Sequence, residues 1–252
     1  MDNGQMLQMA MQQQAIDFGC APEDFCSSEN KVVISKEHPK ARKYYPKLPF
    51  FCALASFGNN VVASVDAAIV DFVLEYINQH KIEDCFVPPN LFTLNDELKK
   101  YGSQISFSAQ RLLPDVDAIK PIPCDYEIKI LRPDAYAYLY DVPEWSNAIG
   151  SGKRKLLDRL AAGAYDGKKL VGFAGSEACC DSMWQLGCDV LPEYRRRGIA
   201  LALTSRLALE ILDIGVVPFG GYVWANIPSF KTQFACGFRP AWVEMTAMSA
   251  DA

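Results

Sequence analysis

Three consecutive arginines, Arg195 to Arg197, stand directly before a glycine and a long apolar segment in the stretch EYRRRGIALALTSRLALEILDIG. The apolar segment predicts a helix buried against a sheet, and the N-terminus of such a helix presents unpaired backbone N–H groups and the positive end of its dipole. Gly198 and the small Ala200 allow the backbone to approach a bound anion closely, while the arginines add charge and forked donors for phosphate oxygens. These residues predict a site for a ligand that carries a pyrophosphate.

The elements expected around this site form an ordered series in the C-terminal half of the chain. The turn Asp166-Gly167 joins two β-prone stretches and predicts a hairpin, and Gly215, with Pro218 close behind, marks the end of the helix. Further strands are expected over 183–191, 219–227 and 238–247, and a short helix over 228–237. The series predicts an α/β (α+β) fold with a mixed, mostly antiparallel central sheet flanked by helices.

Prolines gather just before this series begins, at positions 114, 121 and 123. Because closely spaced prolines disfavour regular structure, we expect a domain boundary near Cys124. The expected domains are a smaller α/β domain of unknown role over 1–124 and a second domain over 125–252.

Local patterns in the N-terminal half predict a few elements but no chemistry. Apolar residues at helical spacing predict a helix over 63–80, and a second helix is expected from 95 or 96 to 101, stopped by Gly102. A short strand is expected over 84–89. The Met- and Gln-rich first fifteen residues are expected to form a loose helix or to be disordered.

Composition excludes several function classes. The 25 Lys and Arg against 30 Asp and Glu give a net charge of -5, which argues against nucleic acid as a partner. No uncharged apolar run reaches the roughly 18 residues that a membrane span needs, and the N-terminus lacks the basic region of a secretory signal, so we expect a cytoplasmic protein. The nine cysteines include no C-x-x-C pair, which favours reduced thiols, and no spacing matches a metal site.

The spacing Arg195-x-x-Gly198-x-Ala200, after a strand that ends in DVLPEY, resembles the acetyl-CoA motif of the GNAT superfamily of N-acetyltransferases. The later stretch NIPSFKTQFACGF is similar to the second helix of that family. The resemblance covers about 126–247, and the whole chain resembles an uncharacterised bacterial group of two-domain GNAT proteins. It implies a GNAT-like C-terminal domain, with acetyl-CoA as cosubstrate and an amine-bearing acceptor as partner.

The resemblance also implies which residues contact acetyl-CoA. The loop from Arg195 to Ala200 would bind the pyrophosphate through backbone amides, with Leu201 just beyond, and one strand would pair by backbone with the pantetheine arm. A bulge at Gly187 is expected to hold open a gap beside that strand. The implied cofactor residues are Cys188, Asp189, Val190, Arg195, Arg196, Arg197, Gly198, Ile199, Ala200, Leu201, Asn226 and Ser229.

Catalysis of amine attack on a thioester needs a proton acceptor, an oxyanion donor and a proton for the leaving thiolate. The family's strand glutamate is replaced here by Trp184, Gln185 or Leu186, and its tyrosine by Gln233. The remaining nearby carboxylates are Glu177, Asp181 and Asp189, each of which could equally be a surface carboxylate. Tyr222 is the candidate acid, with a half-buried strand tyrosine as the alternative.

Two functions of different class follow from these residues. The first is an N-acetyltransferase that moves an acetyl group from acetyl-CoA to a primary amine by direct attack, through a tetrahedral intermediate. The alternative is a non-catalytic CoA-binding or regulatory module, which the missing glutamate and tyrosine favour. The acceptor is not identified by the sequence, because acceptor loops are not determined by a fold.

Overall fold

The computed structural model describes residues 1–43, 45 and 48–249, and the chain divides into two compact units. The first unit comprises Met1–Met6 and Leu112–Pro240, and the second comprises Leu7–Arg111 and Ala241–Ala252. This division differs from the expected boundary at Cys124, which falls inside the first unit. The proline-rich segment packs within that unit, because Ile119 is buried and the carbonyl of Lys120 accepts a hydrogen bond from Ser205.

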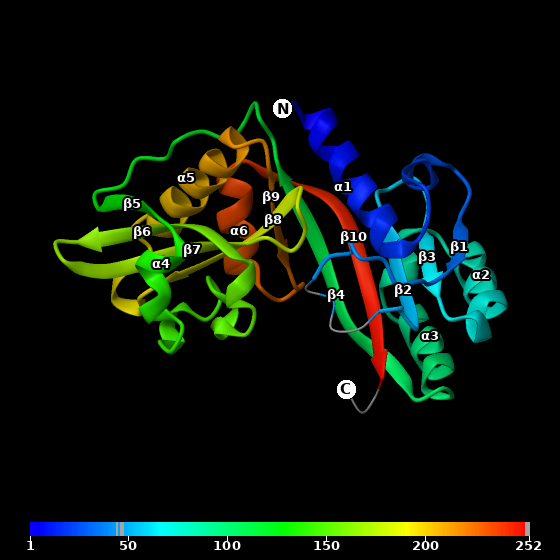
Figure 1. Cartoon of the computed structure of the whole chain (residues 1–252). Helices are drawn as coiled ribbons and strands as arrows, with labels where there is room; N and C mark the ends of the chain where they lie inside the picture. Colours follow the sequence, from blue (N-terminus) through cyan, green and yellow to red (C-terminus); the bar gives the residue numbers. More distant parts are fainter. Residues whose placement is uncertain (44, 46–47, 250–252) are drawn as a thin grey trace. The chain divides into compact units, whose positions relative to one another are not determined.

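The first unit contains a sheet in the strand order β9-β8-β7-β6-β5 (Figure 1). Neighbouring strands pair antiparallel except β8 and β9, which pair parallel. The predicted α/β class, with a mixed and mostly antiparallel sheet flanked by helices, is confirmed. The strands are β5 (Glu127–Leu131), β6 (Asp158–Asp166), β7 (Lys169–Glu177), β8 (Met183–Val190) and β9 (Val217–Tyr222), and the helices are α4 (Pro133–Tyr136), α5 (Ile199–Asp213) and α6 (Ile227–Ala235).

Helix α5 lies on one face of this sheet because its apolar side chains recur every four residues. Ile199, Leu203, Leu207 and Ile211 are fully buried against the small side chains of β6 and β7. A Cβ at Gly172 of β7 would lie 2.6 Å from Ile199 and 3.0 Å from Leu203, so this glycine sets how closely the helix approaches. Since the contact involves the first turn, it also fixes the helix N-terminus.

The opposite face is covered by the segment between β5 and β6, which contains α4 and short 3-10 turns. Trp145 and Ile149 of this segment pack with Phe173 of β7. Two paired glycines make room for its backbone: a Cβ at Gly175 would overlap the carbonyl oxygen of Ala148, and a Cβ at Gly187 that of Asn147. The turns are η4 (Ala137–Leu139), η5 (Pro143–Trp145), η6 (Gly150–Gly152) and η7 (Lys155–Leu157).

The second unit has the strand order β1-β3-β2-β10-β4. Strands β1 and β3 pair parallel, whereas β2 pairs antiparallel with both β3 and β10. Helices α2 and α3 contribute to the main core of this unit. The strands are β1 (Lys31–Ile34), β2 (Cys52–Ser56), β3 (Val62–Val65), β4 (Ser103–Pro114) and β10 (Phe238–Ser249), and the helices are α1 (Asn3–Phe18), α2 (Val70–Gln79) and α3 (Asn90–Lys99).

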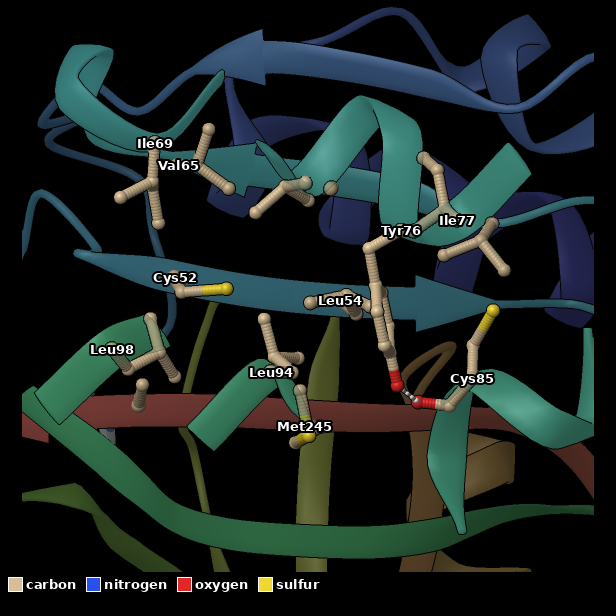
Figure 2. Close-up of a cluster of buried hydrophobic side chains, with 14 of the residues drawn as sticks. Cys52, Leu54, Val65, Ile69, Tyr76, Ile77, Cys85, Leu94, Leu98 and Met245 are labelled. Atoms are coloured by element: carbon tan, nitrogen blue, oxygen red, sulfur yellow. Dashed lines mark hydrogen bonds between the residues drawn. The ribbon is translucent and has the colours of Figure 1, made fainter. Parts of the chain in front are cut away.

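That core gathers apolar side chains from elements far apart in the sequence. Figure 2 shows Leu54 of β2, Ile77 of α2, Leu94 of α3 and Met245 of β10 within one buried cluster, and each is fully buried. The hydroxyl of Tyr76 donates a hydrogen bond of 3.0 Å to the carbonyl of Cys85, which satisfies its polar end inside the cluster. Residues before 90 and after 240 thus share one core.

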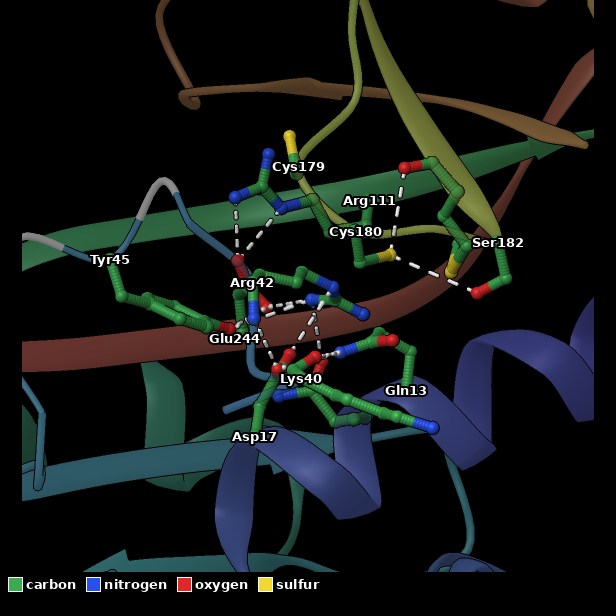
Figure 3. Close-up of polar contacts among 12 residues, drawn as sticks. Gln13, Asp17, Lys40, Arg42, Tyr45, Arg111, Cys179, Cys180, Ser182 and Glu244 are labelled. Atoms are coloured by element: carbon green, nitrogen blue, oxygen red, sulfur yellow. Dashed lines mark hydrogen bonds and ion pairs between the residues drawn. The ribbon is translucent and has the colours of Figure 1, made fainter. Parts of the chain in front are cut away.

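A network of buried charges lies in the same unit (Figure 3). Arg42 and Asp17, whose side chains are both fully buried, form an ion pair at 3.2 Å. The carboxylate of Glu244 accepts from Arg42 at 3.4 Å and from Arg111 at 2.5 Å. Burial raises the pKa of Asp17 to about 6, although the neighbouring Arg42 acts in the opposite direction. The network joins α1, β4 and β10 through side chains.

Several N-terminal predictions need correction. The helix expected over 63–80 begins only at Val70, because 62–65 pair as β3. The strand expected over 84–89 is wrong, since Glu83–Phe86 forms a 3-10 turn, and the helix expected from 95 begins at Asn90. Of the first fifteen residues, 3–15 belong to the helix α1, which continues to Phe18. Further turns are η1 (Pro22–Cys26), η2 (Ala67–Ile69) and η8 (Pro192–Tyr194).

Candidate acyl-transfer site

The candidate site begins where two parallel strands separate. Strands β8 and β9 pair only from Met183 to Gln185, opposite Val217 to Phe219, although β8 continues to Val190. After Gln185, the backbone of β8, which includes Cys188, therefore does not pair with β9. This open edge is the feature that the predicted pairing with an extended ligand requires.

The predicted bulge at Gly187 is wrong. Pairing between β7 and β8 runs without a register shift from Gln185 to Val190. Gly187 instead accommodates the carbonyl oxygen of Asn147 on the covered face of the sheet. The strands thus separate because the pairing with β9 ends after Gln185, whereas the pairing with β7 continues.

The loop after β8 turns sharply into α5. Gly198 is the N-cap of the helix with φ 77° and ψ -3°, and Arg196 also has a positive φ of 65°. In the described part of the chain, no protein carbonyl accepts from the backbone N–H groups of residues 196 to 201. Unpaired N–H groups and a helix dipole are the features that the predicted anion site requires, and they lie at the end of the open edge of β8.

The three arginines at this turn have different partners. Arg195 donates through Nε to the carbonyl of Val190 at 3.1 Å, and Arg197 donates to the hydroxyl of Tyr126 at 2.8 Å and the carbonyl of Glu193 at 3.1 Å. Among the described residues, no group pairs with the exposed guanidinium of Arg196. Two arginines therefore brace the turn, and Arg196 is available to a ligand.

Aromatic side chains support the outer side of the turn. Arg197 lies over the ring of Tyr194, 5.2 Å from its centre, and the ring of Tyr126 meets that of Tyr194 edge to face at 5.8 Å. The hydroxyl of Tyr194 donates to Asp166 at 2.9 Å. These contacts hold the turn against the hairpin of β6 and β7.

The predicted pantetheine residues of α6 form a short hydrogen-bonded chain. The side chain of Asn226 caps the helix by accepting from the N–H of Ser229 at 3.2 Å, and the hydroxyl of Ser229 accepts from Gln233 at 2.9 Å. The side-chain oxygen of Gln233 lies against Gly220 of β9, is buried, and has no partner among the described residues. Asn226 and Ser229 thus build the first turn of α6 beside β9.

The predicted acid, Tyr222, lies at the end of β9. Its ring packs 5.0 Å from that of Phe230 of α6, and burial raises its pKa. The hydroxyl of Tyr222 is protonated at neutral pH, as that of any tyrosine with an ordinary or raised pKa is.

The two predicted carboxylates are both engaged by other groups. Asp189 accepts three hydrogen bonds of 2.7 to 2.9 Å, from the backbone and side chain of Asn147 and from the backbone of Ala148. Arg154 donates to both carboxylate oxygens of Glu177, from Nε at 2.7 Å and from Nη2 at 2.8 Å. Asp189 therefore anchors the segment over the sheet, and Glu177 is an ion-paired carboxylate rather than a solitary base.

A carboxylate that sequence reasoning missed lies beside Glu177. Asp158 is the first residue of β6 and the Cα partner of Glu177, and only 4% of its surface is exposed. Burial raises its pKa to about 6. No local pattern in LLDRLAA indicates this, because the burial arises from strand pairing and from the segment between β5 and β6.

The described residues contain neither a cluster of metal ligands nor a helix that could span a membrane. No three His, Cys, Asp or Glu side chains in this part of the chain come together as metal ligands. Among its helices, none has both the length and the apolar character required to cross a membrane.

No protein-family model and no curated protein matches this chain. Among solved structures, it is similar to a GNAT-family putative acetyltransferase from Novosphingobium aromaticivorans, with 21% identity over 58% of this chain and 66% of the other and a TM-score of 0.41. A GCN5-related N-acetyltransferase-like protein from Streptococcus suis has 20% identity over 63% and 68%, with a TM-score of 0.44. A GCN5-related N-acetyltransferase from Kribbella flavida has 15% identity over 76% and 81%, with a TM-score of 0.49.

Each of these three structures is at most 21% identical to the chain, and each TM-score is below 0.5. The chain spans just under two thirds of the length of the Novosphingobium protein. The functional features of the chain itself are its open strand edge and the helix N-terminus.

Proposed function

We propose that the chain is an acetyl-CoA-dependent N-acetyltransferase of the GNAT type. The observation that carries this proposal is the continuity of two binding features: the open edge of β8 leads directly to the unpartnered N–H groups at the start of α5. An extended arm can pair with Cys188 to Val190 while a diphosphate occupies the loop from Arg195 to Leu201. Few ligands besides a CoA thioester combine an amide-bearing arm with a diphosphate at its end.

The reaction requires a neutral amine to attack the thioester carbonyl. A backbone N–H of β8, with that of Val190 as the candidate, would donate to the oxygen as negative charge develops on it. Tyr222, whose hydroxyl is protonated at neutral pH, would supply the proton to the leaving thiolate. The carbon–nitrogen bond forms as the carbon–sulfur bond breaks.

Calorimetric titration with acetyl-CoA tests the binding half of this proposal. We expect micromolar affinity, which corresponds to about -8 kcal/mol, and its loss in the double variant Arg196→Ala, Gly198→Glu. The matched control is Arg206→Ala, because Arg206 is an exposed arginine of the same helix that pairs with Glu210 at 2.7 Å. If Arg206→Ala weakens binding as much as the double variant, the helix N-terminus is not the phosphate site.

Thiol release from acetyl-CoA over a panel of primary amines tests the transfer half. An N-acetyltransferase forms one CoA thiol for each acetylated amine. Tight binding of acetyl-CoA with no thiol release across the panel would contradict the transferase proposal and favour a non-catalytic CoA-binding module.

A further inference from the structure

The feature that the proposed reaction leaves unexplained is the buried carboxylate of Asp158. Its Oδ2 atom is buried, and no donor in the described residues bonds to it. A register shift between Asp158 and Ala161 interrupts the pairing of β6 with β7, and such irregularities redirect a side chain. A carboxylate in this position has lost water without gaining a full set of partners, which is costly unless it has a use.

Its neighbour Glu177 has the opposite environment. Arg154 binds both carboxylate oxygens of Glu177, and the side chains of Glu177 and Arg154 are 14% and 42% exposed. Glu177 is therefore reachable from solvent and is held in an ion pair with the guanidinium. The nearby Arg159 donates through Nη1 to the carbonyls of Leu156 and Asp158 rather than to a carboxylate.

These two acids belong to a row that crosses the sheet toward the separated strands. Asp158 pairs with Glu177, Glu177 pairs with Gln185, and Gln185 pairs with Phe219. Side chains of directly opposite residues share one face of a sheet. The thiol of Cys179 connects the row, with Sγ 3.8 Å from Glu177 Oε1 and 3.9 Å from Gln185 Oε1. The row thus runs from a buried acid to the point where β8 leaves β9.

We propose that this row, formed by Asp158, Glu177 and Gln185, removes the proton from the acceptor amine, with Asp158 as the group that finally holds it. The proposal rests on the acetyl transfer proposed above. Gln185 orients the amine by accepting one of its N–H groups. As the nitrogen bonds to the acetyl carbon, one N–H bond breaks and Glu177 takes the proton. Glu177 passes it to Asp158, where an O–H bond forms, and Tyr222 protonates the leaving thiolate.

The direction of transfer follows from the environments of the two acids. Arg154 donates to both carboxylate oxygens of Glu177, whereas Asp158 is buried and burial raises its pKa to about 6. Glu177 also raises the pKa of Asp158, while Tyr140, Arg154 and Arg159 lower it. Two acids whose environments differ in this way form a donor and acceptor pair. Tyr136 also lies near Asp158, but its hydroxyl donates to the carbonyl of Arg159.

The pH dependence of kcat/KM for acetyl transfer to a primary amine tests the proposal. Because the primary amine itself is protonated across this range, kcat/KM falls with unit slope as the pH is lowered toward 6. Below about pH 6 we expect a further unit of slope in the wild type, here called the acidic limb, because protonated Asp158 cannot accept the proton. Asp158→Asn is nearly isosteric and should lower kcat/KM at pH 7 by about 100-fold and abolish that acidic limb. Glu177→Gln should cause a similar loss. The control Asp134→Asn, an exposed acid of the same unit, should leave the profile unchanged.

Infrared difference spectroscopy between pH 5 and pH 7 provides a readout that does not depend on activity. Asp17, whose pKa is also raised to about 6, contributes one protonated-carboxyl band in every variant. The wild type and Glu177→Gln should show a second band, that of Asp158, which Asp158→Asn lacks. If Asp158→Asn retains the acidic limb, or if the second band persists in that variant, the proposal is overturned while the transferase function stands. If the band behaves as expected but no amine releases CoA, the transferase function fails and the role in amine deprotonation fails with it.

Discussion

At the scale of single residues, Arg196 combines a strained backbone with a guanidinium that no described group binds. A side chain other than glycine in the left-handed region costs about 1 to 2 kcal/mol, while glycine costs about 0.5 to 1 kcal/mol through its freedom in the unfolded chain. Arg196→Gly should therefore raise the free energy of unfolding by roughly 0.5 kcal/mol. The same change should weaken acetyl-CoA binding about tenfold, because a phosphate contact is lost.

Urea unfolding and calorimetry of the same preparations measure the two effects. Arg196→Ala is the matched control, since it removes the guanidinium and keeps the strained φ of 65°. It should weaken binding without raising stability. Equal stability of the glycine and alanine variants would contradict the assignment of backbone strain at this turn.

Residues of the candidate site differ in how far the sequence can predict them. The arginines and Gly198 can be proposed from the sequence, because an anion site at a helix start depends on residues adjacent in the chain. The engagement of Glu177 and Asp189 is not predictable in this way, since their partners Arg154 and Asn147 lie 23 and 42 residues away. Asp158 was missed for the same reason, because its burial depends on strand pairing rather than on its neighbours in the chain.

At the scale of elements, the covered face of the first unit depends on the absence of a side chain at Gly187. A Cβ there would overlap the backbone oxygen of Asn147, which a side-chain rotation cannot relieve. Gly187→Ala should therefore lower the free energy of unfolding by about 1 to 3 kcal/mol. It should also raise the KM for acetyl-CoA, because Asp189 anchors the displaced segment to the open end of β8.

Thermal unfolding and steady-state kinetics check this expectation. Gly4→Ala is the matched control: Gly4 lies in α1, and its added Cβ would meet only the side chain of Asp2 at 3.3 Å. That change should be neutral or slightly stabilising, because alanine favours a helix. A Gly187→Ala variant as stable as the control would contradict the close packing of the segment on β8.

Elements defined by local signals were predicted well, and those defined by distant pairing were not. The hairpin at Asp166-Gly167 and the end of α5 near Gly215 depend on turn and capping residues that lie within the element. By contrast, 62–65 form a strand because they pair with β1 and β2, which no local apolar pattern reveals. Distant pairing also determines which segments form a compact unit, since residues 243–247 pair with β2, nearly two hundred residues earlier.

At the scale of the whole molecule, each unit contains one buried acid whose pKa is raised to about 6 from 3.8, Asp17 in the second unit and Asp158 in the first. A raised pKa means that the folded state binds the proton more tightly than the unfolded state does. The stability contributed by protonation is therefore complete below about pH 4 and is lost as pH rises through 6. Between pH 5 and pH 7 the free energy of unfolding should fall by about 1 kcal/mol for each of the two acids.

Urea unfolding of the full chain at pH 5 and pH 7, followed by circular dichroism, measures this loss. The Asp158→Asn side chain does not titrate, so this variant should show about half of the wild-type difference in the free energy of unfolding between pH 5 and pH 7. It should also be more stable than the wild type at pH 7, because it does not bury an ionised carboxylate. Asp115 and Glu193, whose pKa values are lowered, act in the opposite direction but titrate below this window. A protein that is more stable at pH 7 than at pH 5 would show that neither buried acid keeps its proton preferentially in the folded state.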